Sequence, residues 1–326
     1  MTIILYSIIV LGILGLIYGL ILAFASIKFH VEIDPKIEQI TEVLPNANCG
    51  ACGFAGCSAY AEAIVEKGVE INRCAPGGEN VTKQIADIMG TEATTQERKI
   101  AVIHCQSGGE NNTYFRYKYE GVNTCKAIVL ISEGPNLCNY GCVYQNDCIE
   151  ACKFDALSLD KNGMRIVDIE KCTGCGACVR ACPRNLIELV PVSKKVHILC
   201  SSHDRGIVAK KNCGNQTACI GCGLCAKKCP VNAIEIKDNL AVIDYEKCIS
   251  CGQCALVCPT NAIEDLLKGM RKKAFIIEEG CIGCTICAKK CPVNAITGEL
   301  KKTHTVDPDK CIGCEICVNA CPKKTI

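Results

Sequence analysis

The pattern of hydrophobic and polar positions divides this chain into an apolar start and a long mixed remainder. No charged residue occurs from Thr2 to Ile27, and this run is long enough to cross a bilayer as one helix. A cleavable signal is the alternative, because Ala23-Phe24-Ala25 is similar to a cleavage site. However, no Lys or Arg precedes the run, and it is longer than a signal core. We therefore expect a transmembrane anchor over residues 1–28.

Beyond the anchor, the apolar residues first follow a helical period. Ile37, Ile40, Val43 and Leu44 are spaced for one helix face, and Pro45 ends that helix. An alanine-rich helix and a helix through Ile85 and Ile88 follow. The pattern predicts a small α-helical domain over residues 32–92.

Later segments alternate between short strands and short helices. IAVIHC and KVHILC are apolar strands that end in cysteine, and AIEI and LAVID are strand-like stretches. The expected fold class is α+β. We expect residues 100–133 and 193–215 to be the two halves of a small strand-containing unit, with another domain inserted between them.

Cysteine dominates the chemistry, with 32 in 326 residues. Five runs share the spacing C-x2-C-x2-C-x3-C-P, which is typical of 4Fe-4S clusters. In that pattern three thiolates of one run hold one cluster, and the fourth reaches the partner cluster. The five runs are Cys172 to Pro183, Cys219 to Pro230, Cys248 to Pro259, Cys281 to Pro292 and Cys311 to Pro322.

Disulfides and structural zinc are the alternatives for so many cysteines. Disulfide scaffolds are typical of short secreted domains, which this chain does not resemble. Zinc sites usually combine two C-x2-C pairs across a longer spacer. The absence of Trp and the aromatic content of 5% leave little for ordinary cores, so we expect metal binding to stabilise the domains.

Internal repeats organise the runs into modules. CIGCGLCAKKCPVNAI at 219–234 and CIGCTICAKKCPVNAI at 281–296 differ at two positions, which indicates duplication. Pairs of modules predict three ferredoxin-like domains with two clusters each. We call residues 134–192, 216–270 and 274–326 the first, second and third ferredoxin-like domains.

The crossed fourth ligand assigns six cysteine quartets to these domains. In the first domain they are Cys138, Cys142, Cys148 and Cys182, and Cys172, Cys175, Cys178 and Cys152. In the second they are Cys219, Cys222, Cys225 and Cys258, and Cys248, Cys251, Cys254 and Cys229. In the third they are Cys281, Cys284, Cys287 and Cys321, and Cys311, Cys314, Cys317 and Cys291.

One module departs from the repeat. CNYGCVYQNDCIEACKFDAL has cysteine spacings of three, five and three, and Lys153 stands where the other modules have proline. Because solvent exposure and hydrogen bonds to sulfur set cluster potentials, we expect an altered potential at this site.

Eight cysteines lie outside the ferredoxin-like domains or their quartets. The helical domain holds Cys49, Cys52, Cys57 and Cys74, for which we expect a 4Fe-4S cluster, with 2Fe-2S as the alternative. The other four end or follow the two cysteine-terminated strands, and they either form an eighth cluster or are buried structural thiols. These four are Cys105, Cys125, Cys200 and Cys213. The sequence thus predicts seven 4Fe-4S clusters, with eight possible.

The sequence offers no chemistry beyond electron transfer. It contains neither the glycine-rich motif for NAD or flavin nor the phosphate loop for ATP, and no catalytic residue is expected. The net charge of +2 and the lack of a basic arm give no indication of nucleic-acid binding. A membrane-anchored electron carrier is the function that remains.

The order of parts resembles the RnfB family, the polyferredoxin subunits of Rnf ion-translocating ferredoxin:NAD+ oxidoreductases. The resemblance rests on the N-terminal apolar run, on IDPKIEQITEVLPNANCGACGFAGC and INRCAPGG, and on the last two cysteine runs. It implies a long form of this polyferredoxin, located at the inner, cytoplasmic membrane with the bulk of the chain on the cytoplasmic side. Lys28 directly after the apolar run favours the same orientation.

The resemblance also implies the partners. Reduced soluble ferredoxin would donate electrons, which would pass to flavin and membrane subunits and on to NAD+, while other subunits move Na+ or H+. A polyferredoxin of another membrane complex, such as a hydrogenase or a reductase of a redox regulator, is the alternative, and an iron-storage scaffold is a second. A basic face is expected to dock an acidic ferredoxin. The candidates are Lys289, Lys290, Lys301, Lys302, Lys323 and Lys324, or Lys227 and Lys228.

Overall fold

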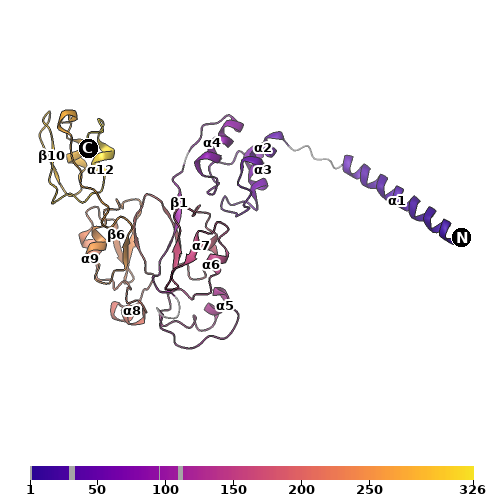
Figure 1. Ribbon diagram of the computed structural model, residues 1–326, viewed down its shortest axis with the longest axis horizontal. Coiled ribbons are helices and arrows are strands. Elements are labelled where there is room, and N and C mark those ends of the chain that lie inside the picture. Colours follow the sequence, from indigo (N-terminus) through magenta and orange to yellow (C-terminus); the bar gives the residue numbers. More distant parts are fainter. Residues whose placement is uncertain (1, 29–33, 95, 109–112) are drawn as a thin grey trace.

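The computed structural model describes residues 2–28, 34–94, 96–108 and 113–326. The expected start of the helical domain at residue 32 lies outside these residues. Figure 1 shows a chain of small units, with helix α1 extending from one end and the C-terminal unit lying at the other. Within the described residues every sheet has two strands, so no large sheet organises the molecule.

Helix α1 (Thr2–Lys28) carries the apolar run. Its described side chains include large exposed hydrophobic groups, such as Leu11 and Leu22 at 69% exposure each. Among the described residues, no helix combines the length and hydropathy of a membrane span. The transmembrane anchor therefore stays a prediction.

The N-terminal helical domain is built from three helices around one core. The helix predicted before Pro45 is confirmed, and Asp34 Oδ1 accepts its first free amide, from Lys36, at 2.8 Å. Ile40, Tyr60 and Ile85 are fully buried where the helices meet. The three helices are α2 (Pro35–Val43), α3 (Cys57–Lys67) and α4 (Gly78–Met89).

The first ferredoxin-like domain contains two short helices and two antiparallel strand pairs. One pair is completed by strand β1, which precedes the domain: Ile103 pairs with Ile187 and Lys99 with Pro191. Ile100, Leu157 and Leu186 are buried beneath the strands. Its elements are β1 (Lys99–Ile103), α6 (Asp147–Glu150), β2 (Leu157–Leu159), β3 (Arg165–Val167), α7 (Ala177–Ala181) and β4 (Ile187–Pro191).

The second ferredoxin-like domain repeats this plan. Its extra strand β5 also precedes the domain and pairs with the last strand, with Val196 opposite Asp265. The strands predicted from AIEI and LAVID are confirmed as the β6–β7 hairpin. Its elements are β5 (Val196–Ile198), α9 (Leu224–Lys228), β6 (Ile234–Lys237), β7 (Leu240–Ile243), α10 (Gln253–Leu256) and β8 (Ile263–Asp265).

The third ferredoxin-like domain is the smallest. A single short hairpin accompanies two short helices, and the domain's core cluster contains four buried residues, two of which are Cys287 and Cys317. Its elements are η2 (Glu278–Gly280), α11 (Ile286–Lys290), β9 (Ile296–Thr297), β10 (Thr305–Val306) and α12 (Ile316–Ala320).

The two cysteine-terminated strands do not pair with each other. Strand β1 joins β4, and strand β5 joins β8, so each extends its own ferredoxin-like domain. Each strand instead completes an unpaired edge in the domain that follows it. Their ends nevertheless meet: His104 Nδ1 lies 2.6 Å from the carbonyl of Ile198, and Ser201 Oγ donates to the carbonyl of His104 at 3.0 Å.

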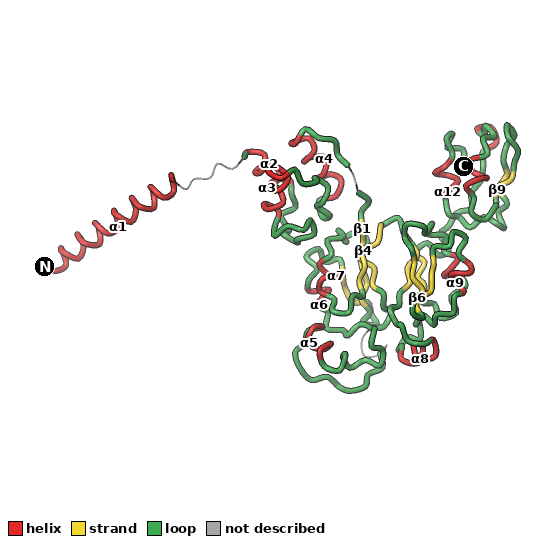
Figure 2. Tube along the Cα trace, turned by 180° about the vertical axis from the view of Figure 1, so that it is seen from behind, coloured by secondary structure: helices red, strands yellow, loops and turns green. Residues whose placement is uncertain are grey.

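Two further helices lie on loops beside this meeting point. Helix α5 (Cys125–Leu130) begins at Thr124, whose side chain accepts the amide of Ala127 at 3.2 Å. Helix α8 (Gly206–Asn212) ends at Cys213. Figure 2 shows both helices at the edge of the molecule, below the strands of the first two domains.

In four of the five regular cysteine runs, the loop packs tightly on a neighbouring segment. Gly174, between Cys172 and Cys175, has a φ of +69°, and a Cβ built there would lie 2.4 Å from the carbonyl oxygen of Lys99. Only glycine combines this backbone conformation with so close an approach. Strand β1 and the cysteine loop are thereby held together.

We predict that Gly174→Ala lowers thermal stability by separating the cysteine loop from β1. Gly269→Ala is the matched control, because Gly269 has a φ of +76° with nothing within 4 Å of its Cβ position. The control should show only the cost of the left-handed backbone, about 1 kcal/mol. Gly174→Ala should lose cluster absorbance at a clearly lower temperature on heating; equal melting temperatures would contradict the tight approach.

Two basic side chains join the N-terminal helical domain to the first ferredoxin-like domain. Lys153 Nζ donates to the carbonyl of Ala47 at 2.9 Å. Arg180 Nη2 donates to the carbonyl of Cys49 at 2.9 Å and its Nη1 to that of Cys175 at 3.3 Å. The lysine at the position where the other modules have proline thus contacts the preceding domain.

Each of these exposed contacts adds little stability alone, so both side chains are replaced together. The double variant Lys153→Met/Arg180→Met should exchange amide hydrogens faster in the loop at residues 46–50. Lys171→Met removes another exposed lysine, whose ion pair with Asp168 spans 3.9 Å, and should leave that loop unchanged. Hydrogen-exchange mass spectrometry compares the three proteins, and identical exchange would show that the two contacts do not hold the domains together.

Candidate metal centres

All 32 cysteines are described and all are free thiols, so no disulfide joins any two of them. Within the described part of the chain, no group of three or more His, Cys, Asp or Glu is arranged around a single ion. A cubane cluster interposes its own iron and sulfide between the thiolates. The relevant question is therefore which cysteines surround a common space, and whether their sulfurs are buried and hydrogen-bonded.

In the N-terminal helical domain, the structure brings the four expected cysteines together. Burial raises the pKa of the Cys74 thiol to about 11, and the nearby thiolates of Cys57, Cys49 and Cys52 add to the increase. The loop is fixed from both ends: Asn48 Oδ1 accepts the amide of Cys57 at 2.8 Å.

Tyr60 holds the segment that precedes Cys74. Its hydroxyl donates to the carbonyl of Glu70 at 2.8 Å and accepts the amide of Arg73 at 3.0 Å. Burial raises the pKa of Tyr60 to about 12, which keeps the hydroxyl protonated and able to donate. The aromatic ring at this position therefore fixes the last of the four cysteines relative to the first three.

In the second ferredoxin-like domain, the fourth cysteine of each run crosses to the other run. Burial raises the pKa of Cys225 to about 11, and its neighbouring thiolates are those of Cys219, Cys222 and Cys258. Burial also raises the pKa of Cys251, whose neighbours include the thiolates of Cys229 and Cys248. Both groupings are those expected from the spacing.

The third ferredoxin-like domain follows the same rule. One cavity is lined by the first three cysteines of one run and the fourth of the other, and a second cavity by the reverse combination. The first cavity holds Cys281, Cys284, Cys287 and Cys321, and the second holds Cys311, Cys314, Cys317 and Cys291.

The first ferredoxin-like domain follows the rule at one site. Burial raises the pKa of Cys178 to about 11, and the thiolates of Cys172, Cys175 and Cys152 raise it further. These are the four cysteines that the spacing groups together.

At the other site of this domain the structure departs from the expected grouping. The cavity that contains Cys142, Cys148 and Cys182 also contains Cys125, which the sequence assigned elsewhere. Burial raises the pKa of Cys148 to about 12, and the thiolates of Cys142, Cys125 and Cys182 are among its neighbours. Cys138 is absent from the residues that line this cavity.

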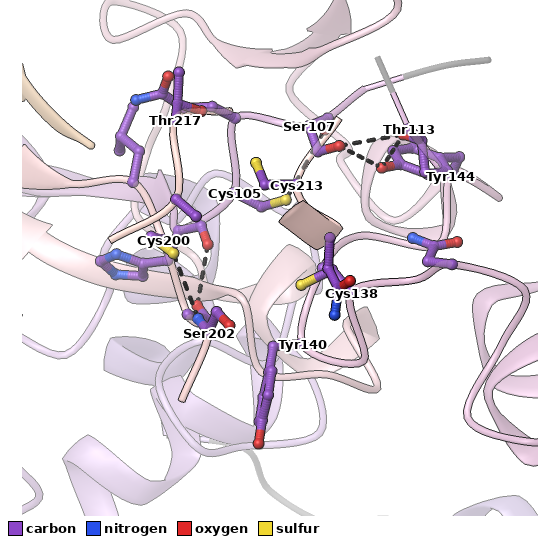
Figure 3. Close-up of a pocket in the computed structure, with 18 residues that line it drawn as sticks. Cys105, Ser107, Thr113, Cys138, Tyr140, Tyr144, Cys200, Ser202, Cys213 and Thr217 are labelled. Atoms are coloured by element: carbon purple, nitrogen blue, oxygen red, sulfur yellow. Dashed lines mark hydrogen bonds between the residues drawn. The ribbon is translucent and has the colours of Figure 1, made fainter. Parts of the chain in front are cut away.

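Cys138 instead lines a separate cavity with the three remaining cysteines (Figure 3). Sequence reasoning missed this exchange because helix α5 enters the site from upstream of the repeat. The irregular spacing of the module was the one available signal. These four cysteines are Cys105, Cys138, Cys200 and Cys213, and we call them the junction cysteines.

Backbone amides donate to the sulfurs in a repeated pattern. The fourth cysteine of a module accepts the amide four residues later, at 3.2–3.4 Å. Such bonds stabilise thiolate over thiol and tune the potential of a bound cluster. The pairs are Ala156 to Cys152, Leu186 to Cys182, Ala233 to Cys229 and Ala295 to Cys291. Buried thiols with aligned amides fit iron-sulfur ligation.

Comparison with known protein families places iron-sulfur models on the same segments. A putative Fe-S cluster family matches residues 44–76, and a 4Fe-4S binding domain matches 165–188. One 4Fe-4S dicluster family matches residues 218–262. A second 4Fe-4S dicluster family matches residues 241–297 and 274–326. Several 4Fe-4S clusters are therefore the cofactors of this chain.

Curated relatives cover most of the chain, and each is a component of an ion-translocating complex. One, from the Na+-translocating ferredoxin:NAD+ oxidoreductase complex of Acetobacterium woodii, is 42% identical over 73% of this chain and 71% of its own length. Its counterpart in the proton-translocating complex of Clostridium ljungdahlii is 41% identical over 75% and 85%. Another, from an ion-translocating oxidoreductase complex of Methanosarcina acetivorans, is 43% identical over 65% and 80%.

One solved structure is also similar in part. A chain of the formate dehydrogenase, heterodisulfide reductase and formylmethanofuran dehydrogenase complex of Methanospirillum hungatei is 25% identical, over 54% of this chain and 71% of its own. The TM-score of 0.22 is too low to indicate a common overall arrangement. The family is instead settled by the curated relatives, and it is the one that the sequence resembled. The chain belongs to the RnfB family of iron-sulfur subunits of ion-translocating ferredoxin:NAD+ oxidoreductase complexes.

Proposed function

We propose that this chain accepts electrons from reduced soluble ferredoxin and relays them, cluster by cluster, towards the flavins and NAD+ of an Rnf-type complex. It is an iron-sulfur electron-transfer subunit of such a complex, which is an oxidoreductase and translocase. The observation that carries the proposal is that basic side chains link the cysteine loops of neighbouring domains. An iron-storage scaffold would not need that continuity.

The first contact in this series links the N-terminal helical domain to the first ferredoxin-like domain. The guanidinium of Arg180 donates to the carbonyls of Cys49 and Cys175, which belong to different sites. One side chain thus contacts the backbone of a cysteine loop in each domain. A positive charge between them also stabilises the negative charge that an added electron brings.

A second contact links the second and third ferredoxin-like domains. Burial is the main cause of the raised pKa of Cys251, and the thiolate of Cys314 in the third domain adds to it. The connecting segment is anchored at both ends: Arg271 Nη2 donates to the carbonyl of Ser250 at 2.7 Å, and Lys273 Nζ donates to that of Cys311. The half-buried Arg271 also pairs with Asp265 at 2.7 Å, which fixes its direction.

The protein holds the clusters and sets their reduction potentials. Each bound cluster supplies reversible one-electron transfer. The thiolates hold it, the amides that donate to sulfur set its potential, and the short helices and hairpins exclude water. Cys222 is the one exposed cysteine of the 32, so its site lies nearest to solvent.

Electron entry requires a surface that an acidic ferredoxin recognises. All eight candidate lysines are exposed. Six belong to the third ferredoxin-like domain, and Lys227 and Lys228 lie on helix α9 of the second, next to the exposed Cys222. Steering follows the summed field of all charges. The third domain holds seven lysines and six acidic residues, whereas the second holds five lysines and six acidic residues, so the balance favours docking at the third.

Charge reversal on the two faces distinguishes them. Lys289→Glu/Lys290→Glu should slow reduction of the full complex by ferredoxin at low salt by about tenfold or more, and high salt should narrow the difference. Lys227→Glu/Lys228→Glu is the matched pair, with the same Lys-Lys spacing at the end of an equivalent helix, and should have a smaller effect. Stopped-flow kinetics measures the rates. A rate that does not depend on ionic strength in the unaltered complex would exclude electrostatic docking.

The membrane association of the complex also needs an attachment. The curated relatives support a membrane-associated assembly with other Rnf subunits. We propose that α1 crosses the inner, cytoplasmic membrane once, with Lys28 and all cysteines on the cytoplasmic side, where thiols stay reduced. Ion movement is assigned to other subunits, because one helix cannot form a gated path for Na+ or H+.

Deletion of residues 1–28 tests the anchor. The full chain should sediment with membranes and resist an alkaline carbonate wash, whereas the shortened chain should be released and keep its clusters. Fractionation with an iron assay measures both. A shortened chain that stays in the washed membranes would contradict anchoring by α1.

A further inference from the structure

The junction cysteines come from four separate segments that meet between the first two ferredoxin-like domains. Cys105 follows strand β1, Cys200 follows strand β5, and Cys213 ends helix α8. Cys138 lies on the loop after α5. Figure 3 shows their sulfurs turned towards the same cavity. Four free thiols around one space are the number that a cubane cluster requires.

The cavity has the burial that a ligand site needs. None of the four junction cysteines is exposed. The cavity that they line is also bordered by Asn136, Ser202 and Ala218, which are buried at 1–3% exposure. A cluster in this cavity would be held by thiolates that lie away from bulk water.

The amide pattern of the regular sites recurs here. The amide of Ser202 donates to Cys200 Sγ at 3.5 Å, two residues along the chain. In the second ferredoxin-like domain, the amide of Ser250 donates to Cys248 Sγ at 3.4 Å with the same spacing. The amide of Cys142 donates to Cys105 Sγ at 3.5 Å. The junction sulfurs are therefore presented to the cavity as ligand sulfurs are elsewhere.

Arg184 fixes the loop that carries Cys138. Its Nη1 donates to the carbonyl of Cys138 at 3.2 Å and to that of Gly141 at 2.7 Å. This residue follows Cys182 and Pro183 in the first ferredoxin-like domain. The regular domain thus holds Cys138 away from its own cavity and at the junction.

Cys125 is held just as firmly in the other cavity. Its amide donates to both carboxylate oxygens of Asp147, at 2.9 and 3.0 Å, and Asp147 begins helix α6 next to Cys148. Burial of the Cys125 side chain, at 7% exposure, leaves it facing Cys142, Cys148 and Cys182. It is therefore not available to the junction.

We propose that Cys105, Cys138, Cys200 and Cys213 hold an eighth 4Fe-4S cluster, and that Cys125 replaces Cys138 as a ligand of the neighbouring cluster in the first ferredoxin-like domain. The inference rests on the proposed electron-relay function. It gives the site a position in the relay: Cys142, beside Cys105, belongs to the first domain, and Cys219, beside Cys200, belongs to the second.

Iron counting in paired alanine variants of the full chain, made anaerobically, tests the grouping. A double variant of two cysteines from one site should lose no more iron than either single variant. A double variant of cysteines from two sites should lose twice as much iron as a single variant. Cys213→Ala should lower the count from about 32 to about 28 iron atoms per chain. Cys213→Ala/Cys138→Ala should stay near 28, and Cys213→Ala/Cys125→Ala should fall to about 24.

Other outcomes overturn the inference. The reverse result for the two double variants would restore the grouping expected from the spacing. An unchanged count in Cys213→Ala, or zinc in place of iron, would remove the eighth cluster. Cys213→Ala/Cys284→Ala is the control, because Cys284 belongs to the third domain, and with eight clusters the pair should lose twice the iron of either single variant under both groupings.

Two measurements keep the test independent of folding and of the proposed function. Should Cys138→Ala fail to accumulate, Cys125→Ala/Cys148→Ala replaces its double variant. The inference places these two cysteines in one site, so the count should stay near 28, whereas the grouping expected from the spacing places them in two sites and gives about 24. Electron paramagnetic resonance of the dithionite-reduced chain should lose the spins of one cluster in Cys213→Ala. A chain with seven clusters that ferredoxin still reduces would contradict this inference but not the proposed function. A chain with eight clusters that ferredoxin does not reduce would contradict the proposed function but not this inference.

Discussion

Ligation of iron by buried thiolates is the interaction on which the rest of this structure depends. The domains are too small, and too poor in aromatic residues, to be held by ordinary cores. In the third ferredoxin-like domain only six hydrophobic residues are buried, and three of them are cysteines. Burial alone disfavours the thiolate form, as the raised pKa values of Cys74, Cys178 and Cys225 show. Metal binding reverses that cost and becomes folding free energy.

The same constraint explains the local structure around each run. The positive φ of Gly174 and its approach to the carbonyl of Lys99 bring a neighbouring segment against the cysteine loop. The short helices end directly before the fourth cysteine, which places that thiol towards the partner site. Amides then point at sulfur because the backbone bends around the space that the cluster fills. At these sites the cysteine spacing, the backbone geometry and the ligand chemistry all indicate the same cluster. The local structure therefore differs little from one module to the next.

The regular parts of the fold could be predicted because their information is local. Spacing alone groups Cys219, Cys222 and Cys225, and the crossed fourth ligand follows from the repeat. The N-terminal helices follow from their apolar period and from Pro45. The pairing of β1 with β4 and of β5 with β8 could not be predicted, since both strands carry the same apolar pattern and sheet edges choose among partners only in three dimensions. The exchange of Cys125 for Cys138 has the same origin: a thiol far upstream occupies a place that a local thiol seemed to fill.

These non-local features lie where the domains join. An electron relay depends on these contacts, because electrons must pass from one domain to the next. Arg180 connects the N-terminal helical domain to the first ferredoxin-like domain, the junction cysteines lie between the first and second, and Arg271 and Lys273 hold the second to the third. Every cysteine of this chain is proposed to be an iron-sulfur ligand. Native mass spectrometry of the anaerobically purified full chain is the decisive measurement. The main species should have the mass of eight 4Fe-4S clusters above the bare chain, and a fully loaded species with seven clusters and four free thiols would show that four cysteines are not ligands.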